Sequence, residues 1–273
     1  MLYFFGALLF GRLQTSMLYN MTEKRVVFGS NMHAQVYPAS LTKKMTLYLL
    51  FKALKEKKVY MNTKMKISKY AASQPRLRLE LTPGDTITVR EAILGIIIRS
   101  CNCCSFVVAE HLAGSVPAFV NQMNATAKVL HLQNSHFRNP SGWHHEKQKT
   151  TAWDMTKLAC ALYRHFPEYR HFFKEKKFTY KGKTVHTHNR IASMYPGAIG
   201  LKTGFTCPAG FNLTAICAGK DTKGKKHHVV SVVMGEASPQ VREKKTCQLF
   251  NRFYKNSSFK ASTKKVKRSP RSS

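Results

Sequence analysis

Three short motifs, in chain order, could supply the parts of a serine acyl-transfer site. The first is Ser40-Leu41-Thr42-Lys43, which places a hydroxyl and an amine three residues apart, on one face of a predicted helix. A serine hydroxyl attacks only when a neighbouring base takes its proton, and a lysine removed from water can be neutral enough to do so. A helix start also aims backbone N–H groups at developing negative charge. Alone, this spacing is equally typical of a capped helix.

The second and third motifs add groups of the same kind. Ser100-Cys101-Asn102 follows an apolar helix, so its serine is able to relay a proton and its asparagine to bind a substrate amide. Lys202-Thr203-Gly204 lies in a predicted strand, where a buried lysine is costly unless it faces a cleft. A glycine there lets an extended substrate pair along the strand.

The elements that must position these motifs follow from hydrophobic periodicity and turn residues. We expect a hairpin from residues 16–20 and 25–29, strands from 197 onward, and helices over 41–54, 89–98, 103–113, 117–130, 152–163 and 240–254. Short turn-broken strands are expected over 60–88, and a polar loop over 134–150. Strands at both chain ends around central helices imply one sheet built from opposite termini, in an α+β or mixed α/β fold.

The composition is that of a globular protein with a strong positive charge. The 273 residues are 43% hydrophobic, and 45 Lys+Arg against 13 Asp+Glu give a formal charge of +32. This excludes a disordered, collagen-like or coiled-coil chain. No apolar stretch approaches the roughly 20 residues of a membrane-spanning helix.

The two chain ends differ from the body between them. Residues 1–15 begin with an apolar run, interpreted as a truncated signal peptide, an upstream mis-start or an ordinary first element. Residues 256–273 form a basic, serine-rich tail, and removing it leaves a charge of +26 on the chain. We expect a single domain over 16–255. Its charge favours anionic lipid or an acidic polymer as partner, whereas no module that reads nucleic acid is recognisable.

Cysteine and histidine spacing does not predict a metal site. The seven cysteines are too irregular for a disulfide scaffold, so we expect buried thiols with at most one or two disulfides. Cys101, Cys103 and Cys104 fit no C-x-x-C zinc spacing. Adjacent histidines, such as His144-His145, point opposite ways in a strand and do not readily share one ion.

In combination, the three motifs are the serine signature of penicillin-binding proteins and β-lactamases. The segment around Tyr37-Pro38-Ala39-Ser40 resembles the nucleophile segment of the low-molecular-mass penicillin-binding proteins, the serine D-alanyl-D-alanine carboxypeptidases. The resemblance covers about residues 17–254. It includes Pro83-Gly84-Asp85, Met123-Asn124, His188-Asn189-Arg190, Gly200-Leu201-Lys202-Thr203-Gly204-Phe205-Thr206 and Ala209-Gly210-Phe211.

The resemblance implies a transpeptidase-like fold: a mainly antiparallel sheet flanked by helices, with an all-helical part beside it. It implies that Ser40 is acylated by the penultimate D-Ala of a peptidoglycan stem peptide. It also implies that β-lactams acylate Ser40 and that this acyl-enzyme is hydrolysed slowly. By the same resemblance Lys43 is the base, and no cofactor takes part. The other roles it implies are a proton network (Ser100, Lys202), amide binding (Asn102), carboxylate binding (Thr203, Arg242), close strand approach (Gly204) and an oxyanion hole from the N–H groups of Ser40 and Phe205. It places the enzyme in the periplasm or cell envelope of a bacterium.

The chain also departs from the family pattern. The family usually reads Ser-Gly-Asn-Asp-Ala at the second motif, whereas this chain reads Ser100-Cys101-Asn102-Cys103-Cys104, and Trp143 stands where the family tends to have leucine. Three alternatives therefore stay open: a DD-endopeptidase or transpeptidase, a β-lactamase, and a non-catalytic polyanion-binding protein. A β-lactamase needs a deacylating acid between the second and third motifs, where only Glu146, Asp154, Glu168 and Glu175 lie.

Overall fold

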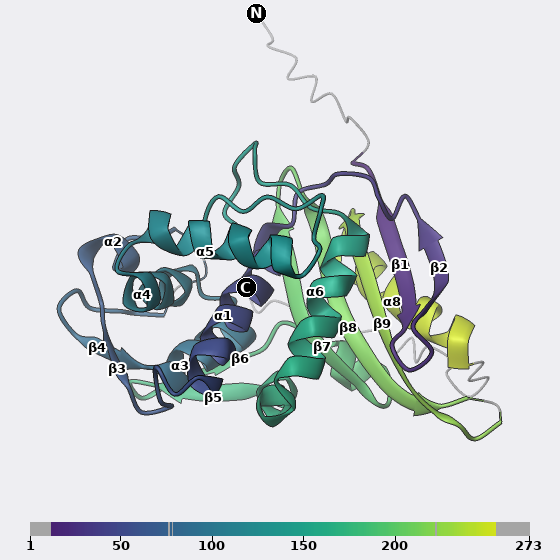
Figure 1. The fold of residues 1–273 in the computed structure, drawn as a ribbon. Helices are drawn as coiled ribbons and strands as arrows, with labels where there is room; N and C mark the ends of the chain where they lie inside the picture. The colour runs from purple at the N-terminus through teal and green to yellow at the C-terminus, as the bar shows by residue number, and fades with distance from the viewer. Residues whose placement is uncertain (1–11, 76, 78, 222, 255–273) are drawn as a thin grey trace, which may run out of the picture.

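One antiparallel sheet of five strands organises the computed structural model (Figure 1). The structure describes residues 12–75, 77, 79–221 and 223–254; the expected apolar segment and basic tail lie largely or wholly outside this range. The strand order is β2-β1-β9-β8-β7, with bounds β1 Thr15–Asn20, β2 Arg25–Ser30, β7 Ala198–Thr206, β8 Gly210–Lys220 and β9 Lys226–Glu236. Strands from opposite chain ends meet where β1 pairs with β9, as predicted.

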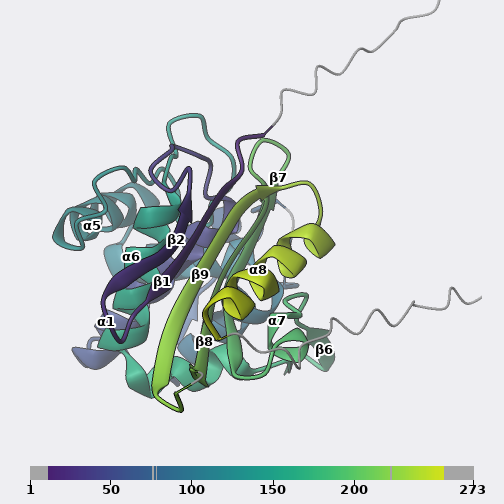
Figure 2. The same cartoon turned by 90° about the vertical axis from the view of Figure 1, so that its right-hand side faces the viewer.

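Helices pack on both faces of this sheet. The main ones are α1 (Lys43–Lys55), α4 (Asn102–Ala113), α5 (Val116–Val129), α6 (Ala152–His165) and α8 (Pro239–Tyr254). Shorter ones are the 3-10 turns η1 (Ala39–Thr42) and η3 (Pro167–Lys174), the π-helical turn η2 (Gly95–Arg99), α2 (Lys69–Ala72), α3 (Val89–Leu94) and α7 (Ile191–Met194). Helix α8 covers one face, and α6 packs on the other (Figure 2).

Strand periodicity of two divides the core between these two faces. On β9, Val229 and Val233 face the cluster under α8, while Val230 and Val232 face the larger cluster shared with α1 and α6. Because β8 and β9 are apolar on both sides, they form the buried centre of the sheet. The mixed α/β class with a mainly antiparallel sheet is therefore confirmed.

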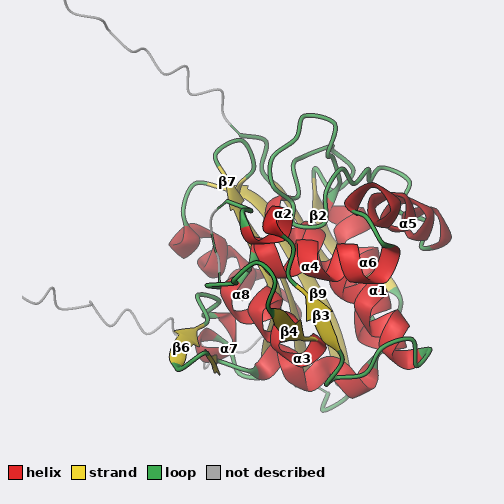
Figure 3. Cartoon of the chain, turned by 90° about the vertical axis from the view of Figure 1, so that its left-hand side faces the viewer, coloured by secondary structure: helices red, strands yellow, loops and turns green. Residues whose placement is uncertain are grey.

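The helical part of the molecule packs on the sheet face that carries the larger hydrophobic cluster, opposite α8 (Figure 3). It holds α2 to α5 together with a small two-stranded sheet, β3 (Lys64–Lys66) and β4 (Thr86–Thr88). Helix α1 contacts both this part and strand β7. The three sequence motifs, at the starts of α1 and α4 and on β7, therefore lie close to one another.

Most predicted helix and strand positions are confirmed, with several local differences. The region 60–88, predicted as strands alone, contains the short helix α2 between β3 and β4. Thr88 caps α3 in a full capping box with Glu91, but Thr151 caps α6 only through the Asp154 N–H. The Asp154 carboxylate instead accepts hydrogen bonds from the Asn134 N–H and the Ser135 hydroxyl. The hairpin of β5 (Lys177–Tyr180) and β6 (Lys183–His186) was not predicted, because each strand has only four residues and too few apolar side chains to give a periodic signal.

Membrane spans were sought among the described residues. No single helix there has both the length and the apolar character to cross a bilayer. Helices α4 and α5 pass that test only as a pair, and they bend by 87° at the break between them.

Helix α1 buries a second lysine beside Lys43. Lys44 is fully buried, and its ammonium donates to the Met155 carbonyl at 3.0 Å and the Thr214 hydroxyl at 2.8 Å. Burial lowers the pKa of Lys44 from 10.5 to about 7. The folded protein therefore disfavours the charged form that the unfolded chain carries below pH 10.5.

Replacing this lysine should stabilise the protein in a pH-dependent way. A pKa lowered from 10.5 to about 7 corresponds to about 5 kcal/mol as an upper limit. This destabilisation grows as pH falls from 10.5 to 7 and is constant below 7. We expect Lys44→Met to raise the free energy of unfolding by about 1–4 kcal/mol at pH 7, less as pH approaches 10. Urea unfolding at pH 6, 7 and 9.5 measures this.

Exposed Lys52, on the same helix, provides the control. Lys52→Met should change stability by less than about 0.5 kcal/mol at every pH. If Lys44→Met and the native protein show parallel pH dependence, buried Lys44 does not titrate as argued.

Candidate active site

The first motif places Lys43 against the Ser40 hydroxyl. Ser40 lies in η1 and Lys43 opens α1, so the serine sits one turn before the lysine. The Lys43 ammonium group contacts Ser40 Oγ at 2.9 Å, Asn102 Oδ1 at 2.7 Å and the Ser141 carbonyl at 2.6 Å. It is completely buried, so these protein groups replace water around it.

Burial also makes Lys43 a usable base. Loss of hydration lowers its pKa to about 7, while the neighbouring thiols Cys101, Cys103 and Cys104 act to raise it. A substantial fraction of Lys43 is thus neutral near pH 7. A neutral amine 2.9 Å from a hydroxyl is within reach to accept its proton.

The backbone around Ser40 is strained and closely packed. Ala39 has φ of 46°, a left-handed conformation unusual for alanine. Gly142, at φ of 80°, approaches so closely that a Cβ there would lie 1.9 Å from the Ala39 carbonyl oxygen. On the other side, Asn212 of β8 donates to the carbonyls of Tyr37 and Pro38. The nucleophile segment is therefore held from both the loop and the sheet.

The second motif connects η2 to α4. Ser100 adopts a left-handed conformation, with φ of 59°, and its buried hydroxyl has no hydrogen-bond partner among the described residues. Asn102 begins α4, where its Oδ1 accepts from Lys43 and its Nδ2 donates to the Pro75 carbonyl at 2.7 Å. Asn102 thus orients the lysine, while the Ser100 hydroxyl is left available to a bound molecule.

The third motif brings a second buried cation. Lys202 is 1% exposed, and its ammonium donates to the Thr203 carbonyl at 3.0 Å. Burial and the charges of Lys43 and Arg242 hold its pKa well below the usual value. The Thr203 hydroxyl contacts His188 Nε2 at 2.8 Å, and burial lowers the pKa of His188 to about 4. His188 is thus neutral at physiological pH.

Gly204 and Phe205 complete the strand beside the nucleophile. A Cβ on Gly204 would lie 3.1 Å from the Ser40 nitrogen, so glycine permits close approach of β7 to η1. The ring of Phe205, 39% exposed, stacks on Phe211 at 4.2 Å. A cleft of about 410 Å³ is lined here by Ser40, Leu77, Ser100, His188, Thr203, Gly204, Phe205, Phe211, Pro239 and Arg242.

Arg242 supplies a cation to the rim of this cleft. Its Nη2 donates to Glu243 Oε1 at 3.0 Å, while its buried Nε has no hydrogen-bond partner among the described residues. The other oxygen of Glu243 accepts from Arg190 at 2.7 Å. Glu243 therefore binds two arginines. The Arg242 Nε–H is a donor that an anionic group could accept from.

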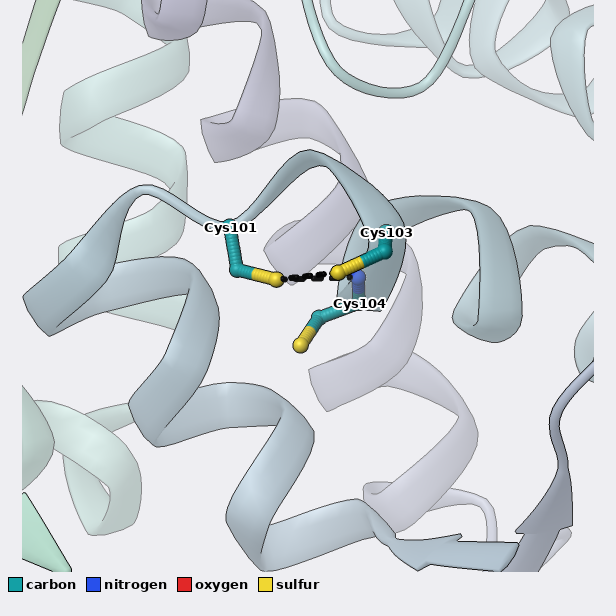
Figure 4. Close-up of side chains that lie close together, drawn as sticks. All are labelled: Cys101, Cys103 and Cys104. Atoms are coloured by element: carbon teal, nitrogen blue, oxygen red, sulfur yellow. Dashed lines mark hydrogen bonds between the residues drawn. The ribbon is translucent and has the colours of Figure 1, made fainter. Parts of the chain in front are cut away.

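Three thiols, from the middle residue of the second motif and from the two residues that follow the motif, lie close together (Figure 4). The sulfurs of Cys101, Cys103 and Cys104 lie within 4.8 Å of one another, although their spacing matches no common zinc motif. Burial raises the pKa of Cys101 and Cys104, whereas hydrogen bonds from these two lower that of Cys103. All seven cysteines are free, so no disulfide forms among them in this structure, and only Cys207 is exposed.

The structure brings every predicted site residue to this one region. Ser40, Ser100, Thr203, Gly204, Phe205 and Arg242 line the cleft, and Lys43, Asn102 and Lys202 lie buried at the motifs beside it. No hydrogen bond joins Ser100 to either lysine in the described part of the chain, so the predicted proton network is not closed.

Sequence reasoning missed three contributors: the Ser141 carbonyl, His188 as partner of Thr203, and Asn212. The His188-Asn189-Arg190 resemblance pointed to the second of these, but a backbone carbonyl and a strand asparagine leave no signal in residue type.

The four acids considered for a β-lactamase lie away from the cleft. Asp154 is buried against Asn134 and Ser135, and Glu146, Glu168 and Glu175 are exposed; none lines the cavity beside Ser40. The structure therefore gives no support to a deacylating carboxylate among them.

Sequence comparison relates the chain to one family. A profile described as D-alanyl-D-alanine carboxypeptidase matches residues 12–238. The chain is 34% identical over 236 residues to D-alanyl-D-alanine carboxypeptidase DacF of Bacillus subtilis, covering 83% of this chain and 58% of that protein. It is 35% identical to DacC of Escherichia coli, covering 80% and 55% respectively. The chain thus spans under three fifths of the length of these curated relatives.

Solved structures show the same fold. D-alanyl-D-alanine carboxypeptidase DacD from Francisella tularensis superposes with a TM-score of 0.81 at 26% identity, covering 87% of this chain and 69% of that one. Penicillin binding protein 6B from Escherichia coli gives a TM-score of 0.80 at 30% identity, covering 89% and 77%.

Proposed function

The chain belongs to the D-alanyl-D-alanine carboxypeptidase family, and from this premise we propose that it removes the terminal D-Ala from peptidoglycan stem peptides through an acyl-enzyme on Ser40. The observation that carries the proposal is the buried Lys43 ammonium, hydrogen-bonded to Ser40 Oγ at 2.9 Å and to Asn102 at 2.7 Å. Residues 16–255 form the peptidase domain in this proposal.

Acylation uses Lys43 as the base. Neutral Lys43 takes the Ser40 hydroxyl proton as Oγ attacks the carbonyl of the penultimate D-Ala. The oxyanion is stabilised by the backbone N–H groups of Ser40 and Phe205, which Gly204 allows to approach one another. Asn102 holds Lys43 in place and binds the substrate amide with its remaining hydrogen-bonding capacity.

Release of the leaving group requires a proton on its nitrogen. In this proposal Ser100 supplies the path, because it lines the cleft and its buried hydroxyl has no hydrogen-bond partner among the described residues. In the same proposal substrate binding closes the contacts among Lys43, Ser100 and Lys202 that are open in the described structure, and the proton taken by Lys43 then passes through Ser100 to the departing D-Ala amine. Water then attacks the acyl-enzyme, Lys43 again accepts a proton, and Ser40 is regenerated. Penicillins acylate Ser40 in the same way and are released slowly.

The terminal carboxylate is bound by Thr203 and Arg242. Arg242 and Thr203 both line the cleft, the Arg242 Nε–H has no hydrogen-bond partner among the described residues, and the neutral His188 contacts the Thr203 hydroxyl. A charged donor selects substrates with a free carboxyl end.

Labelling with a fluorescent penicillin, followed by D-Ala release from a peptide ending in D-Ala-D-Ala, tests the proposed function. Labelling with D-Ala release supports a carboxypeptidase. Labelling without release favours a transpeptidase or endopeptidase, and rapid loss of label favours a β-lactamase. If the protein is neither labelled nor releases D-Ala, the proposed enzymatic function is wrong, and the non-catalytic polyanion-binding alternative is favoured.

Removing the Arg242 cation should weaken recognition of the carboxylate. We expect Arg242→Gln to lower kcat/KM for a D-Ala-D-Ala peptide by about 10- to 100-fold, through loss of a charge-assisted hydrogen bond. The loss should be much smaller when the terminal carboxyl is amidated. Arg190→Gln is the matched control, because Arg190 pairs with the same Glu243 but does not line the cleft. Equal losses in both variants would assign Arg242 a structural role only.

We also propose that the enzyme works in the periplasm or cell envelope of a bacterium, held by charge to anionic lipid or wall polymer. The formal charge of +32 supports this, and the basic tail of residues 256–273 contributes to it. Binding to vesicles containing anionic lipid should be strong at low salt and lost near 1 M salt, where the screening length falls to about 3 Å. Binding that persists in 1 M salt, or equal binding to neutral vesicles, would contradict attraction by charge.

A further inference from the structure

Cys101, Cys103 and Cys104 form a compact group of thiols. Each of the three is 0% exposed, and their sulfurs all lie within 4.8 Å of one another. Cys101 Sγ is only 2.8 Å from Cys103 Sγ (Figure 4). A metal ion bound by three thiolates, with metal–sulfur bonds of about 2.3 Å, places its sulfurs about 4 Å apart. The three sulfurs lie within 4.8 Å of one another, which includes this spacing, but Cys101 Sγ and Cys103 Sγ are closer than it and must move apart to bind a metal ion.

The local backbone creates this arrangement. Cys101 is the N-cap of α4 and accepts from the Cys104 N–H, so the turn folds all three side chains to one side. Gly95 of η2 leaves room for them, because a Cβ there would lie 2.8 Å from Cys104 Sγ.

We propose that Cys101, Cys103 and Cys104 form a binding site for a soft monovalent metal ion, Cu(I), immediately behind the catalytic lysine. Each thiol that ligates the ion releases its proton to solvent, and no electron is transferred. Thiolates select soft ions such as Cu(I). The Lys43 ammonium interacts electrostatically with all three sulfurs and offsets part of their negative charge.

The number of ligands favours Cu(I) over zinc. Structural zinc sites are almost always four-coordinate. Among the described residues, no histidine, aspartate or glutamate joins the three thiols as a fourth ligand. With the group fully buried, water is poorly placed to fill that position. Cu(I) is satisfied by three thiolates, so the site suits it as it stands.

Occupancy of this site should affect the catalytic groups. Asn102 lies between two ligands in the chain and accepts the 2.7 Å hydrogen bond from Lys43. Moving Cys101 Sγ and Cys103 Sγ apart to bind a metal ion shifts the turn that carries Asn102, and with it the hydrogen bond that positions Lys43. We expect the metal-loaded protein to acylate Ser40 more slowly, by up to about tenfold, because Lys43 loses the hydrogen bond to Asn102 Oδ1 that positions it.

The test is an anaerobic titration of the reduced full chain with Cu(I) held by a chromogenic chelator. We expect one copper retained per chain after gel filtration, and X-ray absorption showing three sulfur neighbours at about 2.3 Å. Cys103→Ser and Cys104→Ala should each lower the affinity at least about tenfold. These readouts need no turnover, so failure of the proposed function leaves them unaffected.

Buried Cys160 and exposed Cys207 provide matched controls. Cys160→Ser and Cys207→Ser should retain the same copper as the native chain. Thermal unfolding identifies any variant that fails to fold, and Cys101→Ala then replaces it. The proposal is overturned if the native chain loses copper to the chelator, if Cys103→Ser and Cys104→Ala retain it equally, or if X-ray absorption shows fewer than three sulfurs. Retention of Zn²⁺ in preference to Cu(I) would overturn the choice of ion.

Discussion

Ser40→Ala should abolish covalent labelling by penicillin and lower D-Ala release by at least about 10⁴-fold. The hydroxyl is the group that forms the acyl bond in the proposed mechanism, and no other hydroxyl of the described residues hydrogen-bonds Lys43 Nζ. The remaining donors can still bind substrate, so KM should change far less than kcat. Gel fluorescence after labelling and a D-Ala release assay measure the two effects.

Exposed Ser73 supplies a matched control for this substitution. Ser73→Ala removes a hydroxyl that donates to the Tyr70 carbonyl and does not line the cleft, so both activities should stay within twofold of native. Ser40 is small and its loss leaves little cavity, so Ser40→Ala should melt within a few degrees of native. A labelled Ser40→Ala protein would show that another residue is the nucleophile.

Lys43→Arg should lower the acylation rate by about 1,000-fold or more at every pH from 5 to 9. Arginine keeps the positive charge but does not lose its proton in this range, so it cannot act as a base. In the native protein the pKa of Lys43 is lowered to about 7, and the base is the unprotonated form. The acylation rate should therefore fall about tenfold for each pH unit below 7 and level off above it.

The penicillin acylation rate as a function of pH measures both effects. The control is Lys52→Arg on the exposed side of the same helix, which should reproduce the native profile. A flat native profile between pH 5 and 8, or a Lys43→Arg rate within tenfold of native, would mean that another group takes the Ser40 proton.

The sequence predicted the catalytic motifs well because each carries its signal in residue type and local spacing. Ser40 and Lys43 meet within one helical turn, so their contact needs no knowledge of the rest of the fold. Periodicity was equally informative for β8 and β9, whose apolar residues fill both faces of the sheet.

Contacts made through backbone atoms or through local turns were harder to predict. The Ser141 carbonyl, which binds Lys43, has no side-chain signature, and Asn212 reads as an ordinary strand residue. The thiol group was missed for a different reason. Zinc spacing rules assume C-x-x-C, whereas here an N-cap residue and the first turn of α4 bring together positions 101, 103 and 104.

The left-handed Ala39 has a bearing on thermostability and on how this enzyme can evolve. An L-residue in that conformation costs roughly 1–2 kcal/mol, which glycine would largely avoid. Yet the Ala39 methyl packs toward Gly204, 3.3 Å from where a Cβ on that glycine would lie, and helps to seat β7 against the nucleophile. A mutation to glycine would relieve strain while loosening the catalytic segment, so selection for turnover opposes it. Stabilising substitutions are therefore expected away from the cleft. The left-handed φ of Ala39 is expected to be retained, because the catalytic segment needs it although it lowers stability.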